Sequence, residues 1–433
     1  MFESFPGVLD QIENFIWGYF AAPIILLLGL YFTFKSNFFQ FRKFPAVVRT
    51  FIEFLKLHEN KQRGVHPLKV FFASVGGCVG IGNIVSICTA IQIGGPGALF
   101  WIWITAIVGG MLKYAEVFLG LRYRIANDQG GYNGGPMYYL QKAFKTKWAA
   151  NASALLLCVY GIEVYQFNVI IDSLSTNTHI NPHVIAVLLL ALVILACSGG
   201  IRRVGAISSA IIPTFMVLFV SMGTWVLFQN IEKVPHILYE VFVGAFTGHA
   251  AIGGFVGSIF LLTMSQGIKR GAYSSDVGIG YASVIYSESS VKNLPQQASL
   301  VLFDVFLDTF VICTTSLGLI LLTDVWHEPV NASLLVQNAL SQYFPYMHFF
   351  MPLFLFLLGY STINAFISVG LKCADFLLPV VGRKLYYGYA VVMFLIFSFV
   401  DTLQAQAVMT IAGGLLLIVN CWGIYRLRHE VTY

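Results

Sequence analysis

The chain contains eleven apolar stretches, each long enough to cross a lipid bilayer as a helix, and this pattern constrains its fold most strongly. A helical span needs about 20 mostly apolar residues. We expect the spans at 15–35, 67–93, 97–121, 150–174, 182–200, 206–228, 238–265, 297–323, 346–371, 385–400 and 403–425. Only 10% of the residues are charged, against about 25% in soluble domains. The sequence therefore predicts one all-α integral membrane domain over residues 1–433.

The distribution of Lys and Arg predicts the orientation of these spans, because basic residues gather in cytoplasmic loops. With the N-terminus outside, 23 of the 25 Lys and Arg residues fall in cytoplasmic segments. Of the other two, Lys233 lies outside and Lys113 lies within a span. Basic loops could instead bind anionic lipid, but the alternation from loop to loop favours an N-out, C-in topology. The net charge of +5 therefore needs no nucleic-acid partner to explain it.

Glycines interrupt two of the apolar stretches. The second stretch has glycines at 76, 77, 80 and 82, and the seventh has them at 244, 248, 253, 254 and 257. Close helix packing would explain one such pair, but four glycines within seven residues exceed what packing needs. Irregular backbone is tolerated at membrane depth only where it is buried or lines a cavity. We therefore expect both spans to be broken helices.

The two interrupted spans are five spans apart, so the segments that begin with them would cross the membrane in opposite directions. Such inverted repeats are typical of secondary transporters, in which the breaks hold substrate and coupling ion near the midplane. We expect an extra N-terminal span at 15–35, a first repeat at 67–228 and an inverted second repeat at 238–425. This is the five-plus-five arrangement of the leucine-transporter fold.

Three motifs resemble those of the alanine or glycine:cation symporter family. They are VGIGNI at 79–84 followed by GGPGALFWIW at 94–103, GGPMYY at 134–139, and GIKRGAYSSDVGIG at 267–280. The last resembles the family's RGxFSNEAGxG, and the likeness continues through 306–314 and covers about 15–422. The resemblance implies a sodium-coupled importer of alanine or glycine in a bacterial inner membrane.

The sequence also departs from the family pattern. The family's Ser-Asn-Glu-Ala-Gly is Ser-Ser-Asp-Val-Gly at 274–278, and the small-residue stretch that follows differs at 280–289. In the ninth span Ser361 and Thr362 are kept, whereas the family's Trp is Phe366 and its YYGE is SVGL at 368–371. These changes leave the fold intact but bear on which substrate and ion are used.

An amino-acid substrate brings two charges into hydrocarbon, and each needs a partner there. We expect free N–H groups at Gly77, Gly80 and Gly82 to bind the carboxylate, and Asn83 and Gln166 to bind the ammonium. Gln166 matches a substrate-contacting Gln of the family, although an interhelical hydrogen bond would also explain it. The substrate-binding residues predicted in full are Gly77, Gly80, Gly82, Asn83, Gln166, Thr247, Gly253, Gly254 and Phe366.

The resemblance also implies a sodium site, in which carbonyls of the second span face hydroxyls of the ninth. The residues expected there are Gly76, Cys78, Val79, Asn83, Ser361 and Thr362. Ser and Thr in membrane helices often bond to their own backbone instead, so this assignment depends on the family match. Apart from sodium, we expect no metal, and no cofactor.

Ionisable residues inside spans are functional candidates by default. We expect Lys113 and Glu116, at i and i+3, to form a structural pair. Asp304 and Asp308 share a helix face, and Asp308 is a candidate for coupling or for ion access. Glu163 departs from the family, so it is interpreted either as a partner of the substrate ammonium or as a carrier of a proton in place of sodium. It could also face an aqueous vestibule.

The alternative prediction is a proton-coupled transporter of the same fold that carries another small amino acid or solute. A channel or a sensor is less consistent with two broken helices five spans apart. A membrane enzyme is disfavoured because no HExxH, GxSxG or paired-carboxylate motif lies in the spans. The expected partners are the amino acid, sodium and the lipid bilayer, and a monomer suffices for the mechanism.

Overall fold

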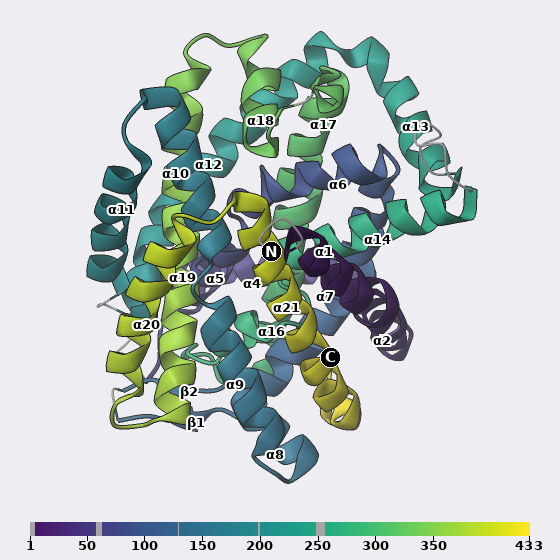
Figure 1. Ribbon diagram of the computed structural model, residues 1–433. Coiled ribbons are helices and arrows are strands. Elements are labelled where there is room, and N and C mark those ends of the chain that lie inside the picture. The colour runs from purple at the N-terminus through teal and green to yellow at the C-terminus, as the bar shows by residue number, and fades with distance from the viewer. Residues whose placement is uncertain (1–4, 58–62, 129, 198–199, 248–255, 329) are drawn as a thin grey trace.

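The computed structural model describes residues 5–57, 63–128, 130–197, 200–247, 256–328 and 330–433 (Figure 1). The protein is almost entirely helical in this part of the chain. Its one small sheet pairs β1 (Ile125–Ala126) with β2 (Tyr132–Asn133) in antiparallel fashion. The long apolar segments form the helices, which agrees with the all-α prediction.

The helices follow one another with short connections. The elements of the first half are α1 Phe5–Ile16, the π-helical turn η1 Trp17–Ala21, α2 Ala22–Lys35, α3 Phe39–Arg42, α4 Phe44–Leu55, α5 Pro67–Cys78, the 3-10 turn η2 Ile81–Asn83, α6 Ser86–Gly94, α7 Ala98–Arg122, α8 Pro136–Phe144, α9 Trp148–Tyr160, α10 Val164–Thr178, α11 Pro182–Cys197 and α12 Gly200–Gln229. Those of the second half are η3 Ile231–Lys233, α13 Val234–Thr247, α14 Val256–Ser274, α15 Tyr281–Tyr286, α16 Leu294–Val305, the π-helical segment η4 Phe306–Cys313, α17 Thr314–Leu322, η5 Val325–His327, α18 Ala332–Ser341, α19 Met347–Leu377, α20 Gly382–Phe397, α21 Thr402–Arg426 and η6 Arg428–Glu430.

Within the described residues, seven helices are long and apolar enough to cross a membrane, and the bent pair α5 and α6 makes an eighth. The other three expected spans correspond to α11, which has a shorter apolar helix at Pro182–Ala196, to the α13–α14 region and to α20. A multi-pass membrane protein is therefore confirmed.

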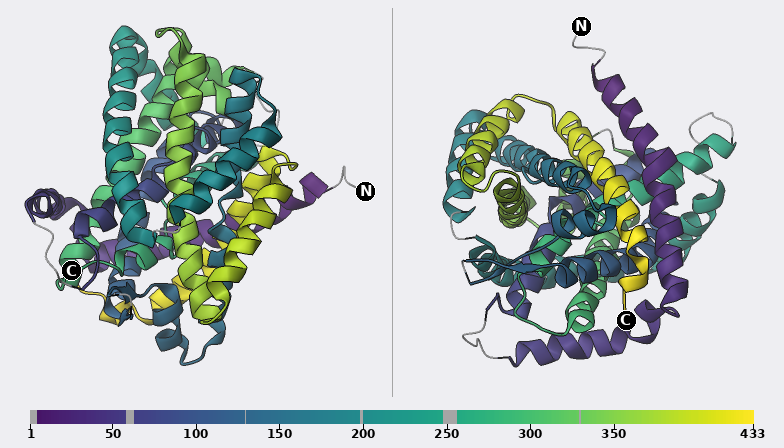
Figure 2. Two further views of the ribbon diagram at one scale, coloured as in Figure 1. Left: turned by 90° about the vertical axis from the view of Figure 1, so that its left-hand side faces the viewer. Right: turned by 90° about the horizontal axis from the view of Figure 1, so that it is seen from below.

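The N-terminal helices lie at the side of the bundle. Seen from below, α1 and α2 run along one flank beside α21, and α4 crosses a neighbouring edge (Figure 2). The indole N–H of Trp17 donates to the carbonyl of Thr410 at 2.9 Å, which fixes this flank to α21.

The expected break in the second span is present. The α5 helix ends at Cys78, α6 begins at Ser86, and their axes are bent by 50°. Gly80 has an extended backbone with φ −136° and ψ −159°, and every residue from Val79 to Val85 is buried. The glycine pattern therefore predicted this break at the correct place.

The break expected in the seventh span cannot be compared with the structure, but a break that was not expected follows it. The glycine-rich 244–257 stretch lies mostly at 248–255, outside the described residues. A buried non-helical segment follows 20 residues later, at Ser275–Gly280, between α14 and α15. Asp276, Gly278 and Gly280 have φ angles of +49°, +74° and +102° there. The left-handed conformation stops the helix, because an ordinary helical residue cannot adopt it without strain.

The position of this second break also corrects the expected cytoplasmic loop at 266–296. Lys269 and Arg270 lie in the last turns of α14 and are buried, with 2% and 5% of their surfaces exposed. The prediction places them in a loop because the apolar stretch ends before them. The two broken segments meet inside the bundle, where α14 packs on α6 and α7 and α15 packs on α5 and α7.

Candidate functional site

Side chains from other helices replace the hydrogen bonds that the helix loses at the first break. The N–H of Gly80 donates to Oδ1 of Asn83 at 3.0 Å. The N–H of Ile81 donates to Oε1 of Gln166, on α10, at 3.3 Å. Buried backbone groups need such partners, and both partners are residues that were predicted to bind substrate.

The three predicted glycines differ in their surroundings. A side chain at Gly80 would meet the hydroxyl of Thr362 and the amide of Gln166, so the backbone approaches both closely. A Cβ at Gly82 would meet only the ring of Tyr273, at 3.9 Å, which leaves space beside Gly82. Gly77 lies inside α5 and packs against Tyr281. Its N–H therefore belongs to the helix, which corrects the expectation of a free N–H there.

The predicted sodium ligands of α5 and α19 lie next to each other. The hydroxyl of Thr362 donates to the carbonyl of Gly76 at 2.9 Å. The hydroxyl of Ser361 lies 2.8 Å from that of Ser208, on α12, and both hydroxyls face Gly76. The helices α5, α12 and α19 thus bring oxygen atoms together near the end of α5, three residues before Val79. Ser208 was not predicted.

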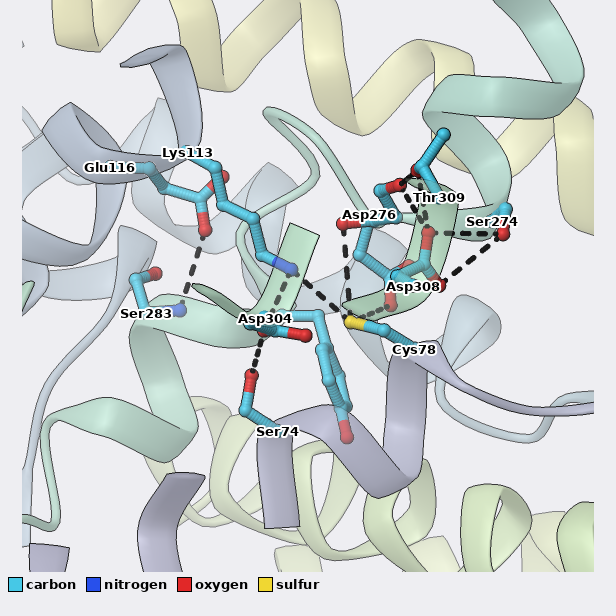
Figure 3. A network of polar contacts seen from close by, with 12 residues as sticks. Ser74, Cys78, Lys113, Glu116, Ser274, Asp276, Ser283, Asp304, Asp308 and Thr309 are labelled. Atoms are coloured by element: carbon cyan, nitrogen blue, oxygen red, sulfur yellow. Dashed lines mark hydrogen bonds and ion pairs between the residues drawn. The ribbon is translucent and has the colours of Figure 1, made fainter. Parts of the chain in front are cut away.

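Asp308 is completely buried and accepts hydrogen bonds from neutral groups only (Figure 3). Its Oδ1 accepts from the amide of Asn83 at 2.5 Å, and its Oδ2 accepts from Ser275 at 2.5 Å and from Thr309 at 3.0 Å. Ser274 lies 3.4 Å from both oxygens. No ion pair joins Asp308 to a basic residue in the described part of the chain. The first break, the second break and η4 therefore meet at one carboxylate.

Asp304, one turn earlier, has a charged partner. The ammonium of Lys113, on α7, lies 3.1 Å from Oδ2 of Asp304, and neither side chain is exposed. Ser74 donates to the same oxygen at 3.0 Å, and Lys113 also contacts the sulfur of Cys78 at 3.2 Å (Figure 3). The expected pairing of Lys113 with Glu116 is thus corrected. Lys113 pairs with a carboxylate on another span, that of Asp304, rather than with Glu116 one turn away on its own helix.

Glu116 and Asp276 stabilise the second break. Glu116 accepts from the N–H groups of Gly280 at 3.1 Å and of Ser283 at 3.3 Å, where α15 begins. Asp276 accepts from the hydroxyl of Tyr160 at 2.8 Å and from the thiol of Cys78 at 3.4 Å. Cys78, predicted as a sodium-site residue, therefore directs its side chain at the second break.

Glu163 lies at the joint between α9 and α10 and has a positive φ of 51°. A non-glycine residue in this conformation is uncommon and often occurs at functional sites. Its carboxylate is buried and accepts from the hydroxyl of Tyr273 at 3.3 Å. It therefore faces the end of α14 rather than open solvent, and Gln166 follows it on the next turn.

Phe366 belongs to an aromatic layer next to this region. Its ring stacks on that of Tyr281 with centroids 4.0 Å apart and meets the ring of Tyr160 at 5.4 Å. The same Tyr281 packs on Gly77, and the same Tyr160 bonds to Asp276. Phe366 thus connects α19 with both breaks.

Thr247, a predicted substrate ligand, is not part of this arrangement. Thr247 is exposed at the end of α13, and its hydroxyl donates to the carbonyl of Val243 at 2.9 Å. Its prediction as a substrate ligand is therefore not supported. Gly253 and Gly254 lie outside the described residues.

Sequence reasoning missed Ser208, Ser275, Asp276, Thr309 and the tyrosines of the second break. The available signal was the rule that an ionisable residue within a span is a functional candidate. It was not applied to Asp276 because that residue was placed in a loop. Single Ser and Thr residues carry no comparable signal, since most of them bond to their own helix.

Comparisons with known proteins agree with this arrangement. The model of the sodium:alanine symporter family matches residues 3–433. The sodium/alanine symporter AgcS of Methanococcus maripaludis is 27% identical over 442 residues, which covers 96% of this chain and 95% of that protein. The probable sodium/glutamine symporter GlnT of Bacillus subtilis is 28% identical over 438 residues, covering 98% and 88%.

A solved structure shares the fold. The substrate-bound, outward-open structure of a Na⁺-coupled sialic acid symporter aligns with a TM-score of 0.55 at 13% identity, covering 95% of this chain and 87% of that one. The fold and the buried polar site define a secondary transporter. The chain belongs to the sodium:alanine symporter family, and it is a sodium-coupled amino-acid transporter of the membrane.

Proposed function

We propose that this protein imports a small neutral amino acid, alanine or glycine, by symport with sodium. The observation that carries the proposal is Asp308, a buried carboxylate that contacts both broken helices through Asn83 and Ser275. An unpaired buried charge is costly, and a bound cation would remove that cost. The name of the relative AgcS supports alanine as the substrate.

The substrate is proposed to bind beside the first break. Its carboxylate would meet the N–H of Gly82 and would displace Oδ1 of Asn83 from the N–H of Gly80, at the start of a half-helix whose dipole favours an anion. Its ammonium would meet Gln166 and the carboxylate of Glu163. The space beside Gly82 faces Tyr273, and the aromatic layer around Phe366 would limit the size of the substrate side chain.

Sodium is proposed to bind at two places. One is the set of oxygens around Asp308, with Asn83, Ser275 and Thr309. The other joins the carbonyls of Gly76 and Val79 to the hydroxyls of Ser361 and Thr362, with Ser208 as an additional ligand. Carbonyls and hydroxyls at unwound segments are the usual ligands of coupling ions in such transporters. The amide of Asn83 would link the first ion to the substrate.

Transport is proposed to follow alternating access of two inverted repeats, at 67–228 and 238–425, with eleven helices in all. The span at 15–35 stays outside this five-plus-five unit. The N-terminus would lie outside and the C-terminus in the cytoplasm of a bacterial inner membrane, and one chain would be sufficient.

A second candidate is a proton-coupled transporter of the same fold. Glu163 and Asp276 favour it, because both are buried carboxylates without an ion pair in the described part of the chain and both accept from tyrosine hydroxyls. Such groups can carry a proton across the midplane. Another small amino acid, such as glutamine, would fit the relative GlnT.

The test is uptake of radiolabelled L-alanine by purified protein in liposomes, driven either by an inward sodium gradient or by a proton gradient alone. We expect sodium to be required and Asn83→Ala to abolish uptake. Arg383→Gln, an exposed ion-pair variant on α20, serves as the matched control. Uptake driven only by protons would overturn the ion assignment, and competition by glycine and glutamine would then define the substrate.

A further inference from the structure

A polar cavity of about 560 Å³ lies between α1, α14 and α21, beside α6. Its charged and amide-bearing lining includes Asp10, Glu13, Gln266, Lys269, Arg270 and Gln406. The volume is within the range of about 300–1,000 Å³ that is typical of small-molecule sites. No residue assigned above to substrate or sodium lines it.

The cavity contains two buried cations and one buried carboxylate. Oε1 of Glu13 lies 3.1 Å from the ammonium of Lys269 and 3.9 Å from Nη1 of Arg270. Glu13 is 5% exposed, similar to Lys269 at 2% and Arg270 at 5%. Among the buried groups, one carboxylate therefore serves two cations, whereas the other carboxylates of the cavity, Asp10 and Asp401, are exposed. A buried cation that lacks a full set of partners is costly.

The hydrogen-bonding groups of Arg270 confirm that it is incompletely satisfied. Within the described residues, its buried Nε and Nη1 atoms have no hydrogen-bond partner, and neither does Oε1 of the neighbouring Gln266. A guanidinium presents its N–H groups as a planar fork that matches a carboxylate. A carboxylate ligand in the cavity would therefore supply the partners that Arg270 lacks.

The acids at the rim indicate a zwitterion rather than a simple anion. Asp10 and Asp401 line the same cavity and are exposed. A ligand with its carboxylate at Arg270 would direct its ammonium toward these groups. This combination fits an α-amino acid.

The cavity adjoins the proposed central site. The amide of Gln406 donates to the hydroxyl of Ser86 at 2.5 Å, where α6 begins after the first break. Tyr273, which contacts Glu163, follows Arg270 by three residues on α14. A ligand held in the cavity would thus lie one helix turn from the place proposed for transport.

We propose that this cavity is a second, outer amino-acid site, in which Arg270 binds the substrate carboxylate and Glu13 of the N-terminal helix competes for the same guanidinium. The inference rests on the proposed function, because it takes the transported amino acid as the ligand. The N-terminal helix then has a function in substrate entry, and its carboxylate occupies Arg270 when no substrate is present.

A purely structural ion-pair tie is the alternative explanation. It predicts that loss of either partner weakens the protein and changes binding in the same direction. The proposed competition predicts opposite directions, since removing Glu13 frees Arg270 whereas removing Arg270 removes the site.

The experiment measures equilibrium binding of radiolabelled L-alanine to the full-length purified protein, with sodium and with choline in its place. No group of carboxylates that could hold a metal ion occurs among the described residues of this cavity, so we expect wild type to keep a weak binding component without sodium. Arg270→Gln should lose this component, and Arg270→Lys, which keeps the charge with Glu13, should weaken it about 10-fold, as expected for the loss of one charged hydrogen bond. Glu13→Gln should strengthen it several-fold.

Controls separate this proposal from the central site. Asn83→Ala should remove only the sodium-dependent component, and Arg383→Gln should change neither. Absence of sodium-independent binding in wild type, or equal binding by wild type and Arg270→Gln, would overturn the outer site while leaving the proposed function intact. If wild type shows the sodium-independent component but no sodium-dependent binding, that result counts against the proposed function instead. If chloride but not L-alanine protects Arg270 from a guanidine-modifying reagent, the site binds a simple anion and the proposal fails.

Discussion

Asp304 and Asp308 lie four residues apart on the same face of the eighth apolar stretch, but their surroundings differ. Asp304 is paired with the ammonium of Lys113 at 3.1 Å, whereas Asp308 accepts only from the neutral groups of Asn83, Ser274, Ser275 and Thr309. Both are fully buried. The comparison distinguishes a carboxylate with a permanent counterion from one without a basic partner in the described part of the chain, where the proposed symport would place an exchangeable cation.

The largest expected effect comes from removing the permanent counterion. Lys113→Met should lower the free energy of unfolding by about 3–5 kcal/mol, because Asp304 is left as a buried unpaired charge. The double variant Lys113→Met with Asp304→Asn should recover most of the loss. Both variants are compared with wild type by thermal unfolding in detergent, in which the loss of the monodisperse peak on heating is recorded. A fully stable single variant would contradict the pairing.

The next effect concerns the carboxylate without a basic partner. Asp308→Asn should leave thermal stability close to wild type but raise the sodium concentration for half-maximal uptake by about 10- to 100-fold, the size of one charged contact of about 1.5–3 kcal/mol. Sodium titration of uptake in liposomes gives the measurement. An unchanged sodium dependence would show that Asp308 is as inert toward sodium as Asp304.

Glu163 is a third case in this comparison. In the described part of the chain it has no basic partner, and one hydroxyl, that of Tyr273, donates to it. If it holds the substrate ammonium, protonation weakens binding, so the KM of wild type should rise as the pH falls. Glu163→Gln should have a KM raised about 10-fold that no longer changes with pH. Measurement of KM across about pH 5 to 8 tests this. An uptake rate that increases with acidity only in wild type would identify a proton carrier instead.

The smallest expected effect is loss of one neutral ligand. Ser275→Ala removes a hydroxyl 2.5 Å from Asp308 and should raise the half-maximal sodium concentration about 5-fold, corresponding to about 1 kcal/mol for a single hydrogen bond. Ser209→Ala on α12, whose exposed hydroxyl donates to its own helix, is the matched control. Equal values for the two variants would remove Ser275 from the cation site.

Much of this arrangement was predictable from the sequence because of two local signals. Apolar length predicted the helices, and four clustered glycines predicted the first break with Gly80 and Asn83 at its centre. The second break contains only Gly278 and Gly280, and its first residue with a positive φ is Asp276. The helix that follows is capped by Glu116, which lies on another span. Lys113 was assigned the wrong partner for the same reason. Contacts between distant spans are set by packing, and spacing along one helix does not encode them.

The pairing of Lys113 with Asp304 has an energetic consequence for the cell. An ammonium attached to the chain cannot leave with the substrate, so the charge it supplies performs no work against the membrane potential. A transporter that filled the same position with sodium would gain about 2.3 kcal/mol per 100 mV from each additional ion moved, equivalent to an accumulation ratio about 40-fold higher. Because this protein carries that cation itself, the proposed symport would reach a lower ceiling of accumulation and would use less of the ion gradient for each substrate molecule.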